Sequence, residues 1–293
     1  RNNMKAYIFP GQGSQKPGMG QEIFNEISES RDFFKKANEI LNFNITELMF
    51  EGSSEDLLQT KVTQPAIFIH SVISALTSNT FKPDVCAGHS LGEFSALVSS
   101  KSISFEDGLK LVSIRANAMQ RACQETNGTM AAIIGLEDNV VESVCNEIEG
   151  VVNPANYNCP GQLVISGEVK AVNEACELLK QKGARRALVL AVGGAFHSEL
   201  MSSAADELKK GIENTEFKTP ICPIYQNFTA NAVSKPSIIK SNILSQLTGA
   251  VLWTQSVNKM INDGVKEFYE VGPGNILQGL IKKIDNKVLV GKI

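Results

Sequence analysis

The sequence predicts an α/β protein in which a small subdomain is inserted into a larger domain with a parallel sheet. Three observations lead to this class. Apolar strand patterns alternate with helical patterns along most of the chain. Residues 88–92 have the Gly-x-Ser-x-Gly form of an elbow between a strand and a helix. Residues 127–196 follow a strand and helix order of their own.

The large domain is expected to be α/β-hydrolase-like and to comprise residues 4–126 and 197–293. Its first strand, at 5–9, is a short apolar run that leads into a glycine-rich turn. Pro65 is expected in the opening turn of an apolar helix. Helices are expected at 22–41, from 53, and at 66–76, 104–123, 198–214, 237–247 and 251–262, with strands at 85–87, 221–228 and 267–271 and a final helix and strand after 274.

The inserted subdomain, residues 127–196, is expected to be ferredoxin-like. Its pattern is βαββαβ, the split βαβ arrangement of two helices packed on one antiparallel sheet. A Cys-Pro-Gly turn at 159–161 separates its two middle strands. The expected strands are 130–134, 151–156, 162–166 and 186–192, and the expected helices are 138–149 and 170–182.

Composition excludes several classes of function. The net charge is −3, from 28 basic and 31 acidic residues, and no basic run suggests nucleic-acid binding. The six cysteines are scattered without a Cys-x-x-Cys pair and there are three histidines, so we expect no metal site and reduced thiols. No apolar run reaches the ~18 residues of a membrane span and no signal-peptide pattern precedes the first strand. We therefore expect a cytoplasmic protein that binds neither membranes nor nucleic acid and needs no cofactor.

The segment Gly88-His89-Ser90-Leu91-Gly92 is the strongest indication of chemistry. Its glycines lack a Cβ, so the backbone can turn tightly around Ser90 between an apolar strand and a helix. Such a turn exposes the serine hydroxyl as a nucleophile. The backbone N–H of the residue that follows, Leu91, is the usual first donor to the oxyanion formed in acyl transfer.

A serine nucleophile needs a base, and the sequence offers three histidines. His89 lies on the elbow itself, where its side chain should diverge from the Ser90 hydroxyl, and His70 lies in the middle of an apolar helix. We expect structural roles for both. His197 follows a glycine-rich turn between a strand and a helix, which makes it the best candidate base, although an isolated histidine there can also be structural. No carboxylate with a clear orienting position accompanies it.

The loop Gly11-Gln12-Gly13 is the natural source of a second oxyanion donor, since it follows the first strand. A phosphate cradle is the competing interpretation, but the loop lacks the Walker lysine and its glycine spacing does not match Gly-x-Gly-x-x-Gly. The loop can also be a simple turn. The oxyanion donor is the favoured interpretation, and the simple turn remains the alternative.

Arg115 lies in a largely apolar helix that also carries Met119. An arginine in this position either extends its guanidinium to the surface or pairs with a carboxylate in the interior. Its position in the sequence favours the surface role. The second role requires a substrate with a free carboxylate.

Five segments together resemble a known family: 9–15 (FPGQGSQ), 88–93 (GHSLGE), Arg115, 194–198 (GAFHS) and 270–274 (EVGPG). In this order they closely resemble the malonyl-CoA:acyl carrier protein transacylases of bacterial type II fatty acid synthesis, to which the acyltransferase units of polyketide synthases are related. The segment 156–162 (NYNCPGQ), and Gln246 followed by Trp253-Thr254, add to the resemblance. It extends from Met4 to the C-terminus.

The resemblance implies a role for each site residue. Ser90 would carry the malonyl ester, and His197 would act as base and then as acid, oriented by a main-chain carbonyl near Gln246. The amides of Gln12 and Leu91 would form the oxyanion hole. The substrate-binding residues implied are Gln12, Arg115, Met119, Phe196 and Gln246, with Arg115 pairing with the malonyl carboxylate and Phe196 typical of selection for malonyl over methylmalonyl.

The implied reaction is a ping-pong transfer between two thiols. Malonyl-CoA would acylate the serine, and the phosphopantetheine thiol of acyl carrier protein would then take the malonyl group. We expect a monomer. Because acyl carrier proteins are acidic and this chain is slightly acidic overall, the docking patch should be local. Its candidates are Lys182, Arg185, Arg186, Lys209 and Lys210, each of which can also be an ordinary solvated side chain.

Three other functions share parts of this pattern. A serine esterase or thioesterase has the elbow but does not need Arg115. A trans-acting malonyl acyltransferase of a polyketide synthase has the same site and a different carrier. A non-catalytic docking module needs none of the three residues Ser90, His197 and Arg115, and their joint presence argues against it.

Overall fold

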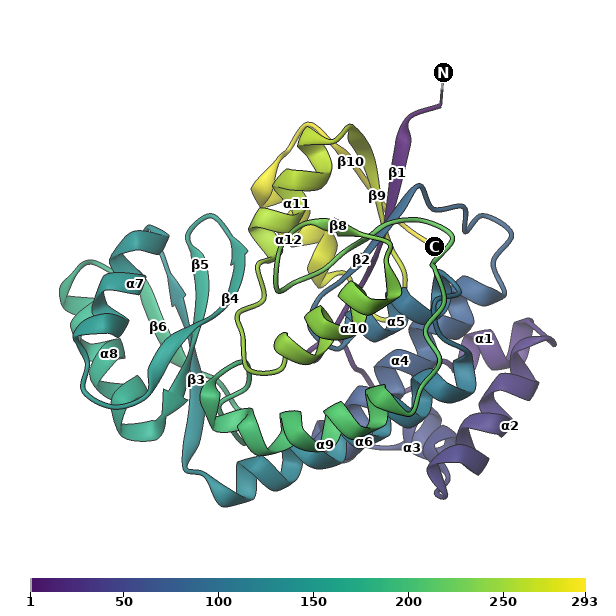
Figure 1. The fold of residues 1–293 in the computed structure, drawn as a ribbon, viewed down its shortest axis with the longest axis horizontal. Helices are drawn as coiled ribbons and strands as arrows, with labels where there is room; N and C mark the ends of the chain where they lie inside the picture. The colour runs from purple at the N-terminus through teal and green to yellow at the C-terminus, as the bar shows by residue number, and fades with distance from the viewer. Residues whose placement is uncertain (1) are drawn as a thin grey trace.

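The computed structural model describes residues 2–293 and contains two separate sheets (Figure 1). The larger sheet has six strands in the order β10-β9-β1-β2-β7-β8. All neighbouring pairs are parallel except β7 and β8. Its strands are β1 (Met4–Phe9), β2 (Val85–Gly88), β7 (Ile224–Tyr225), β8 (Ala232–Val233), β9 (Val265–Glu270) and β10 (Leu289–Lys292).

The central strand β1 is apolar on both faces, as a strand covered by helices on both sides must be. Tyr7 and Phe9 point into one core, with α4, α5 and α6, while Ala6 and Ile8 point into another, with α11 and α12. The helices are α1 (Gln21–Glu26), α2 (Ser30–Leu41), α3 (Ile45–Glu51), α4 (Thr60–Leu76), α5 (Gly92–Ser99), α6 (Phe105–Glu125), α9 (Ser202–Glu213), α10 (Pro236–Ser245), α11 (Trp253–Asn262) and α12 (Ile276–Ile284), with 3-10 turns at Asp56–Leu58 and Glu199–Met201.

The register of the parallel strands brings two important loops together. Phe9 is paired with Gly88, so β1 and β2 end side by side. The glycine-rich loop leaves β1 there and the Ser90 elbow leaves β2. Ligand sites of parallel sheets form outside these carboxyl ends.

The smaller sheet consists of four antiparallel strands in the order β4-β5-β3-β6 and lies on the left in Figure 1. Two helices complete the predicted βαββαβ order and share a core of their own with the sheet. Its elements are β3 (Gly128–Ile134), α7 (Asp138–Glu147), β4 (Val152–Cys159), β5 (Gln162–Glu168), α8 (Val169–Gln181) and β6 (Arg186–Val189).

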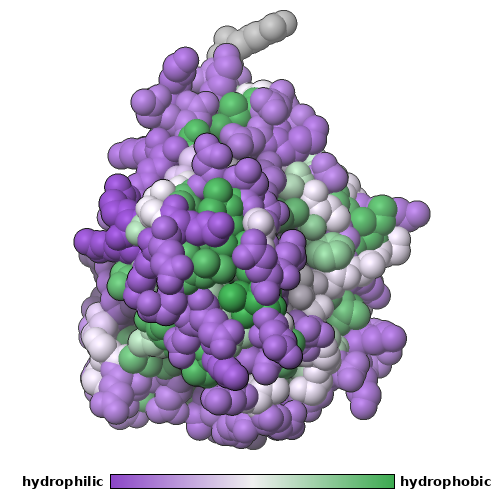
Figure 2. Space-filling view, turned by 90° about the vertical axis from the view of Figure 1, so that its left-hand side faces the viewer, coloured by the Kyte–Doolittle hydropathy of each residue, from purple (hydrophilic) through white to green (hydrophobic). Residues whose placement is uncertain are grey.

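The predicted α/β class, with a parallel sheet and a second, antiparallel sheet, is confirmed. The division of the chain at residues 127 and 196 stays a prediction. Figure 2 shows the face on the side of the smaller sheet, where hydrophilic residues surround a smaller hydrophobic area. In residues 2–293 no helix has both the length and the apolar character needed to cross a membrane.

Several predicted elements have different bounds. The helix expected at 22–41 is two helices, because Ile27 is extended and the Ser30 hydroxyl bonds the carbonyls of Ile23 and Ile27. The apolar helix begins at Thr60, so Pro65 lies inside it and costs the helix one hydrogen bond without ending it. The strand expected at 221–228 is reduced to β7, and the helix expected from 53 is a single 3-10 turn.

Candidate active site

Ser90 occupies the elbow between β2 and α5. Its φ is 54°, a left-handed conformation that is uncommon for a serine. The turn is possible because of the flanking glycines: a Cβ on Gly88 would overlap the backbone of Gly92, and one on Gly92 would overlap the Phe9 carbonyl. Strain of this kind is concentrated at functional sites.

His197 reaches the Ser90 hydroxyl from the loop between β6 and α9. Its Nε2 lies 2.8 Å from Ser90 Oγ, and its Nδ1 lies 2.9 Å from the main-chain oxygen of Gln246. A carbonyl only accepts, so Nδ1 carries the proton and Nε2 is free to accept from the serine hydroxyl. Burial and then the nearby Arg115 cation lower the pKa of His197 to about 3, which keeps the imidazole neutral. His197 also has a positive φ, 58°.

Arg115 lies beneath the serine in the protein interior, where it is 1% exposed. Its guanidinium donates to the oxygens of Ser90 (Oγ, 3.2 Å), Gln246 (Oε1, 3.2 Å) and Gln64 (Oε1, 2.8 Å). Its Nε has no acceptor within residues 2–293. Burial lowers its pKa to about 10, so it stays a cation at neutral pH with donor capacity left over.

Two backbone N–H groups near Ser90 are free to donate. Neither the amide of Gln12 nor that of Leu91 has an acceptor among the described residues 2–293. The glycine-rich loop that carries Gln12 is held by Gln15, whose Oε1 accepts from the N–H of Gly13 at 2.7 Å. A Cβ on Gly11 would overlap the His89 carbonyl, so this loop packs directly against the elbow.

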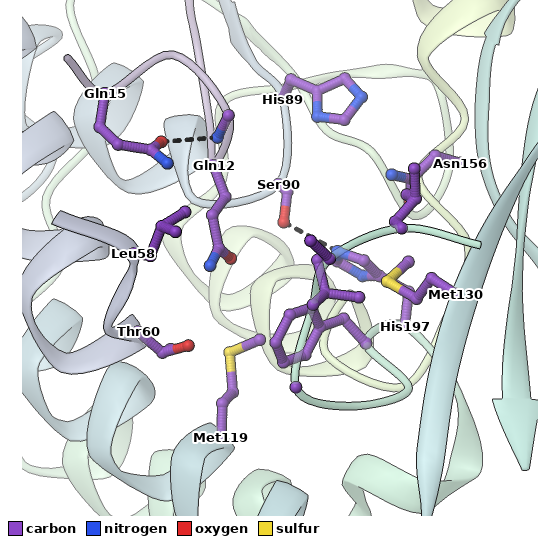
Figure 3. Close-up of a pocket in the computed structure, with 16 residues that line it drawn as sticks. Gln12, Gln15, Leu58, Thr60, His89, Ser90, Met119, Met130, Asn156 and His197 are labelled. Atoms are coloured by element: carbon purple, nitrogen blue, oxygen red, sulfur yellow. Dashed lines mark hydrogen bonds between the residues drawn. The ribbon is translucent and has the colours of Figure 1, made fainter. Parts of the chain in front are cut away.

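A cavity of about 310 Å³ lies next to Ser90 and is lined by residues from both sheets' sides of the molecule (Figure 3). Gln12, Met119 and His197 line it from the large sheet's side, and Met130 and Asn156 line it from the smaller sheet. A second cavity, of about 230 Å³, shares Gln12, His89 and Asn156 with the first. The site therefore has room for a small ligand next to the serine hydroxyl.

The predicted site residues fall into two groups. Gln12, Ser90, Met119, Phe196 and His197 line the cavity. Leu91, Arg115 and Gln246 do not line it but lie directly behind it and are buried.

The other two histidines do not contact the serine hydroxyl. His89 points away from Ser90, as expected, with its Nε2 2.7 Å from Asn158 Oδ1 and its ring near Trp253. His70 remains within α4, where burial lowers its pKa to about 3.

Sequence reasoning missed three polar residues of the site: Gln64, Glu93 and Asn227. Gln64 holds the guanidinium, and its Nε2 donates to the Met119 sulfur at 3.2 Å. Glu93 and Asn227 lie under the elbow, where Asn227 Oδ1 accepts from the Ser90 N–H at 2.8 Å. Glu93 belongs to the elbow segment itself, but nothing in the local sequence of Gln64 or Asn227 indicates that Gln64 contacts Arg115 or that Asn227 contacts Ser90.

An α/β protein with a serine elbow, a histidine partner and a buried arginine has the parts of an acyl-transfer enzyme. The chain belongs to the acyl transferase domain family, whose model matches residues 6–289. It is an acyltransferase.

Relatives of known name resemble the chain over nearly its whole length. A malonyl CoA-acyl carrier protein transacylase of Bacillus subtilis is 41% identical over 288 residues, 97% of this chain and 91% of the relative. The crystal structure of an acyl carrier protein S-malonyltransferase from Vibrio cholerae has a TM-score of 0.95 at 40% identity, covering 99% of this chain and 96% of that one. The structure of a malonyl-transacylase in complex with a type II PKS acyl-carrier protein has a TM-score of 0.94 at 37% identity. The match covers 99% of this chain and 96% of that one.

Proposed function

We propose that this protein transfers the malonyl group of malonyl-CoA to the phosphopantetheine thiol of acyl carrier protein and so supplies fatty acid synthesis. The observation that carries the proposal is the buried Arg115 within 3.2 Å of the Ser90 hydroxyl. A buried guanidinium with spare donors at a serine nucleophile suits an acyl group that has its own carboxylate. The names of the relatives agree with this substrate.

In the first half-reaction, Ser90 Oγ attacks the thioester carbon while its proton moves to His197 Nε2. The amides of Gln12 and Leu91 stabilise the oxyanion. The carbon–sulfur bond then breaks, and His197 returns the proton to the departing CoA sulfur. Malonyl-Ser90 remains, with its carboxylate held by Arg115.

The second half-reaction reverses these steps with a new thiol. The carrier thiol gives its proton to His197 and attacks the ester carbon, and the Ser90 oxygen leaves and regains the proton. Gln246 orients the imidazole through its main-chain oxygen. Met119 and Phe196 shape the cavity around the acyl group.

The acidic carrier would dock through local positive charge. All five candidate cations of the docking patch are exposed. They form two groups along the chain: Lys182, Arg185 and Arg186 lie between the end of α8 and the start of β6, and Lys209 and Lys210 lie on α9. We propose that the protein works as a monomer, because the contacts among Ser90, His197, Arg115 and Gln246 are all made within one chain. The proposed location is the cytoplasm, as expected from the sequence.

The experiment that tests this function compares wild type with Arg115→Ala on malonyl-CoA and holo acyl carrier protein. Malonyl-carrier should form in the wild type, and Arg115→Ala should lose on the order of 100-fold or more in kcat/KM, because a buried charge partner is removed. Arg121→Ala is the matched control, since Arg121 lies on the same helix in an exposed ion pair with Glu207. Free malonate as the main product, or indifference to Arg115→Ala, would point to an esterase.

A second candidate, a malonyl-transacylase serving polyketide synthesis, is favoured by the relative solved with its type II PKS carrier. Its chemistry is the same, so only the carrier distinguishes it. Side-by-side kcat/KM values with a fatty acid carrier and a type II polyketide carrier would decide. We expect the fatty acid carrier to be the better substrate.

A further inference from the structure

Glu93 is a buried carboxylate with no part in the reaction as proposed. It lies in the first turn of α5 and is 0% exposed. Burial raises the pKa of its carboxyl, while the N–H of Asn227 and the Arg115 cation oppose that rise and favour the ionised form. Burying such a group is costly unless its oxygens are well used.

Both oxygens of Glu93 face donors. Oε1 accepts from the backbone N–H of Asn227 at 2.5 Å, and Oε2 lies 3.4 Å from the side-chain nitrogen of Gln246. That end of the Gln246 amide must be the nitrogen, because its other end accepts from Arg115 and the nitrogen donates to the Ser90 carbonyl at 2.9 Å. Glu93 is therefore surrounded by donors, which only an acceptor can satisfy.

The two partners of Glu93 hold the reacting groups. The side chain of Asn227 makes hydrogen bonds to the two residues that flank His89 in the elbow. It accepts from the Ser90 N–H at 2.8 Å and donates to the Gly88 carbonyl at 2.7 Å. Gln246 orients His197 through its main-chain oxygen. Its side chain joins Arg115 to the elbow.

We propose that Glu93 is a positioning residue for acyl transfer. Through Asn227 and Gln246 it fixes the elbow, the His197 ring and the Arg115 guanidinium relative to one another. The inference rests on the proposed function, since it assigns Glu93 to the geometry of that reaction. The rival explanation is structural: a carboxylate in the first turn stabilises α5 through the helix dipole.

Substitutions at position 93 separate these explanations. Glu93→Gln would turn an NH₂ group toward a donor, either Gln246 or Asn227. We expect roughly a 10- to 100-fold loss in kcat/KM for malonyl transfer, since small displacements of reacting groups are costly. Glu93→Asp keeps the charge at the helix N-terminus but is one methylene shorter. We expect it to lose activity about 10-fold, whereas a dipole role predicts no loss.

The decisive measurement is a double-mutant cycle of Glu93→Gln and Gln246→Met in malonyl transfer. If Glu93 acts through Gln246, Glu93→Gln should cost less than about 3-fold in the Gln246→Met background, because the clashing donor is gone. An equal loss in both backgrounds would overturn the proposal. So would full activity of both Glu93→Gln and Glu93→Asp. If Glu93→Gln does not fold, Glu93→Asp alone decides.

Glu270→Gln is the matched control. Glu270 is also 0% exposed and accepts from the amides of Leu277 and Gln278, but it contacts no residue of the Glu93 network. We expect it to lower the unfolding temperature while leaving kcat/KM within about 2-fold. Failure of the proposed function itself is distinguishable, because the wild type would then form no malonyl-carrier.

Discussion

His197 lies where a positive charge is unfavourable, and the pH dependence of the acylation rate should show this. Because burial and Arg115 lower its pKa from 6.5 to about 3, the imidazole stays a competent base as the pH falls. We expect kcat/KM for acylation to remain flat from pH 7 to about pH 5. Half-loss of activity near pH 6.5 in the wild type would contradict this.

Arg115→Ala gives the complementary prediction. It removes the largest cause, after burial, that lowers the pKa of His197, so that pKa should rise and the acid limb of kcat/KM should move toward neutral pH. Acetyl-CoA is the suitable substrate for this measurement, because its acyl group makes no demand on Arg115. An unchanged acid limb would show that Arg115 does not act on the histidine.

Phe196 should limit the size of the acyl group. It is 5% exposed and lines the cavity next to His197. We expect malonyl-CoA to acylate the wild type faster than methylmalonyl-CoA, and Phe196→Ser to narrow that difference by freeing volume. Rate constants of acylation for the two thioesters check this, and equal rates in the wild type would overturn the role given to Phe196.

Site residues could be predicted only where short sequence patterns contain them. Ser90 and His197 stand in recognisable segments, and the structure brings them within 2.8 Å of each other. Arg115 was open to a surface role, and its burial beneath Ser90 became visible only when α4, α6 and the elbow were packed together. Gln64 and Asn227 come from distant segments, so no local pattern could indicate them.

At the scale of elements, the elbow depends on glycines that carry no side chain. Gly92→Ala would drive a Cβ into the Phe9 carbonyl of the neighbouring strand. We expect a loss of more than about 2 kcal/mol in the free energy of unfolding, together with loss of acylation, because β1 and α5 must separate. Denaturant unfolding and acylation of the same sample check both effects.

Gly279→Ala is the control for that substitution. Gly279 lies inside α12, and an added Cβ would have no neighbour within 4 Å. Alanine favours a helix over glycine by about 0.5–1 kcal/mol, so this variant should be more stable than the wild type and fully active. A destabilised Gly279→Ala would contradict the packing described for α12.

Element types were predicted better than element bounds. The strands β1 and β2 and the βαββαβ order follow from apolar patterns that packing reinforces. Predictions failed where a side chain competes for the backbone: Ser30 interrupts the first predicted helix, and Asn44 caps the unexpected helix α3 by accepting from the Glu47 N–H at 3.2 Å. Such hydrogen bonds between a side chain and the nearby backbone leave no periodic pattern in the sequence, so they could not be predicted from it.

At the scale of the whole molecule, the two sheets are joined through β4. The Tyr157 N–H donates to the Val251 carbonyl at 2.9 Å, and the Val251 N–H donates to the Ala155 carbonyl at 2.7 Å. The His89–Asn158 bond adds a link at the elbow. The active-site cavity is lined by residues from both sheets' sides of the molecule, so its shape depends on this junction.

Because of this junction we expect the two sheets to unfold together. Calorimetry should give one transition whose van't Hoff and calorimetric enthalpies agree, as for a single cooperative unit. Two resolved transitions would show that the smaller sheet is an independent domain.

The central claim is that Ser90 carries malonate between two thiols. Mass spectrometry of the protein after brief incubation with malonyl-CoA, without a carrier, tests it most directly. We predict one malonyl group per chain, located on the peptide that contains Ser90, lost on addition of holo acyl carrier protein and absent from Ser90→Ala. No adduct, or an adduct on another residue that survives in Ser90→Ala, would contradict the account.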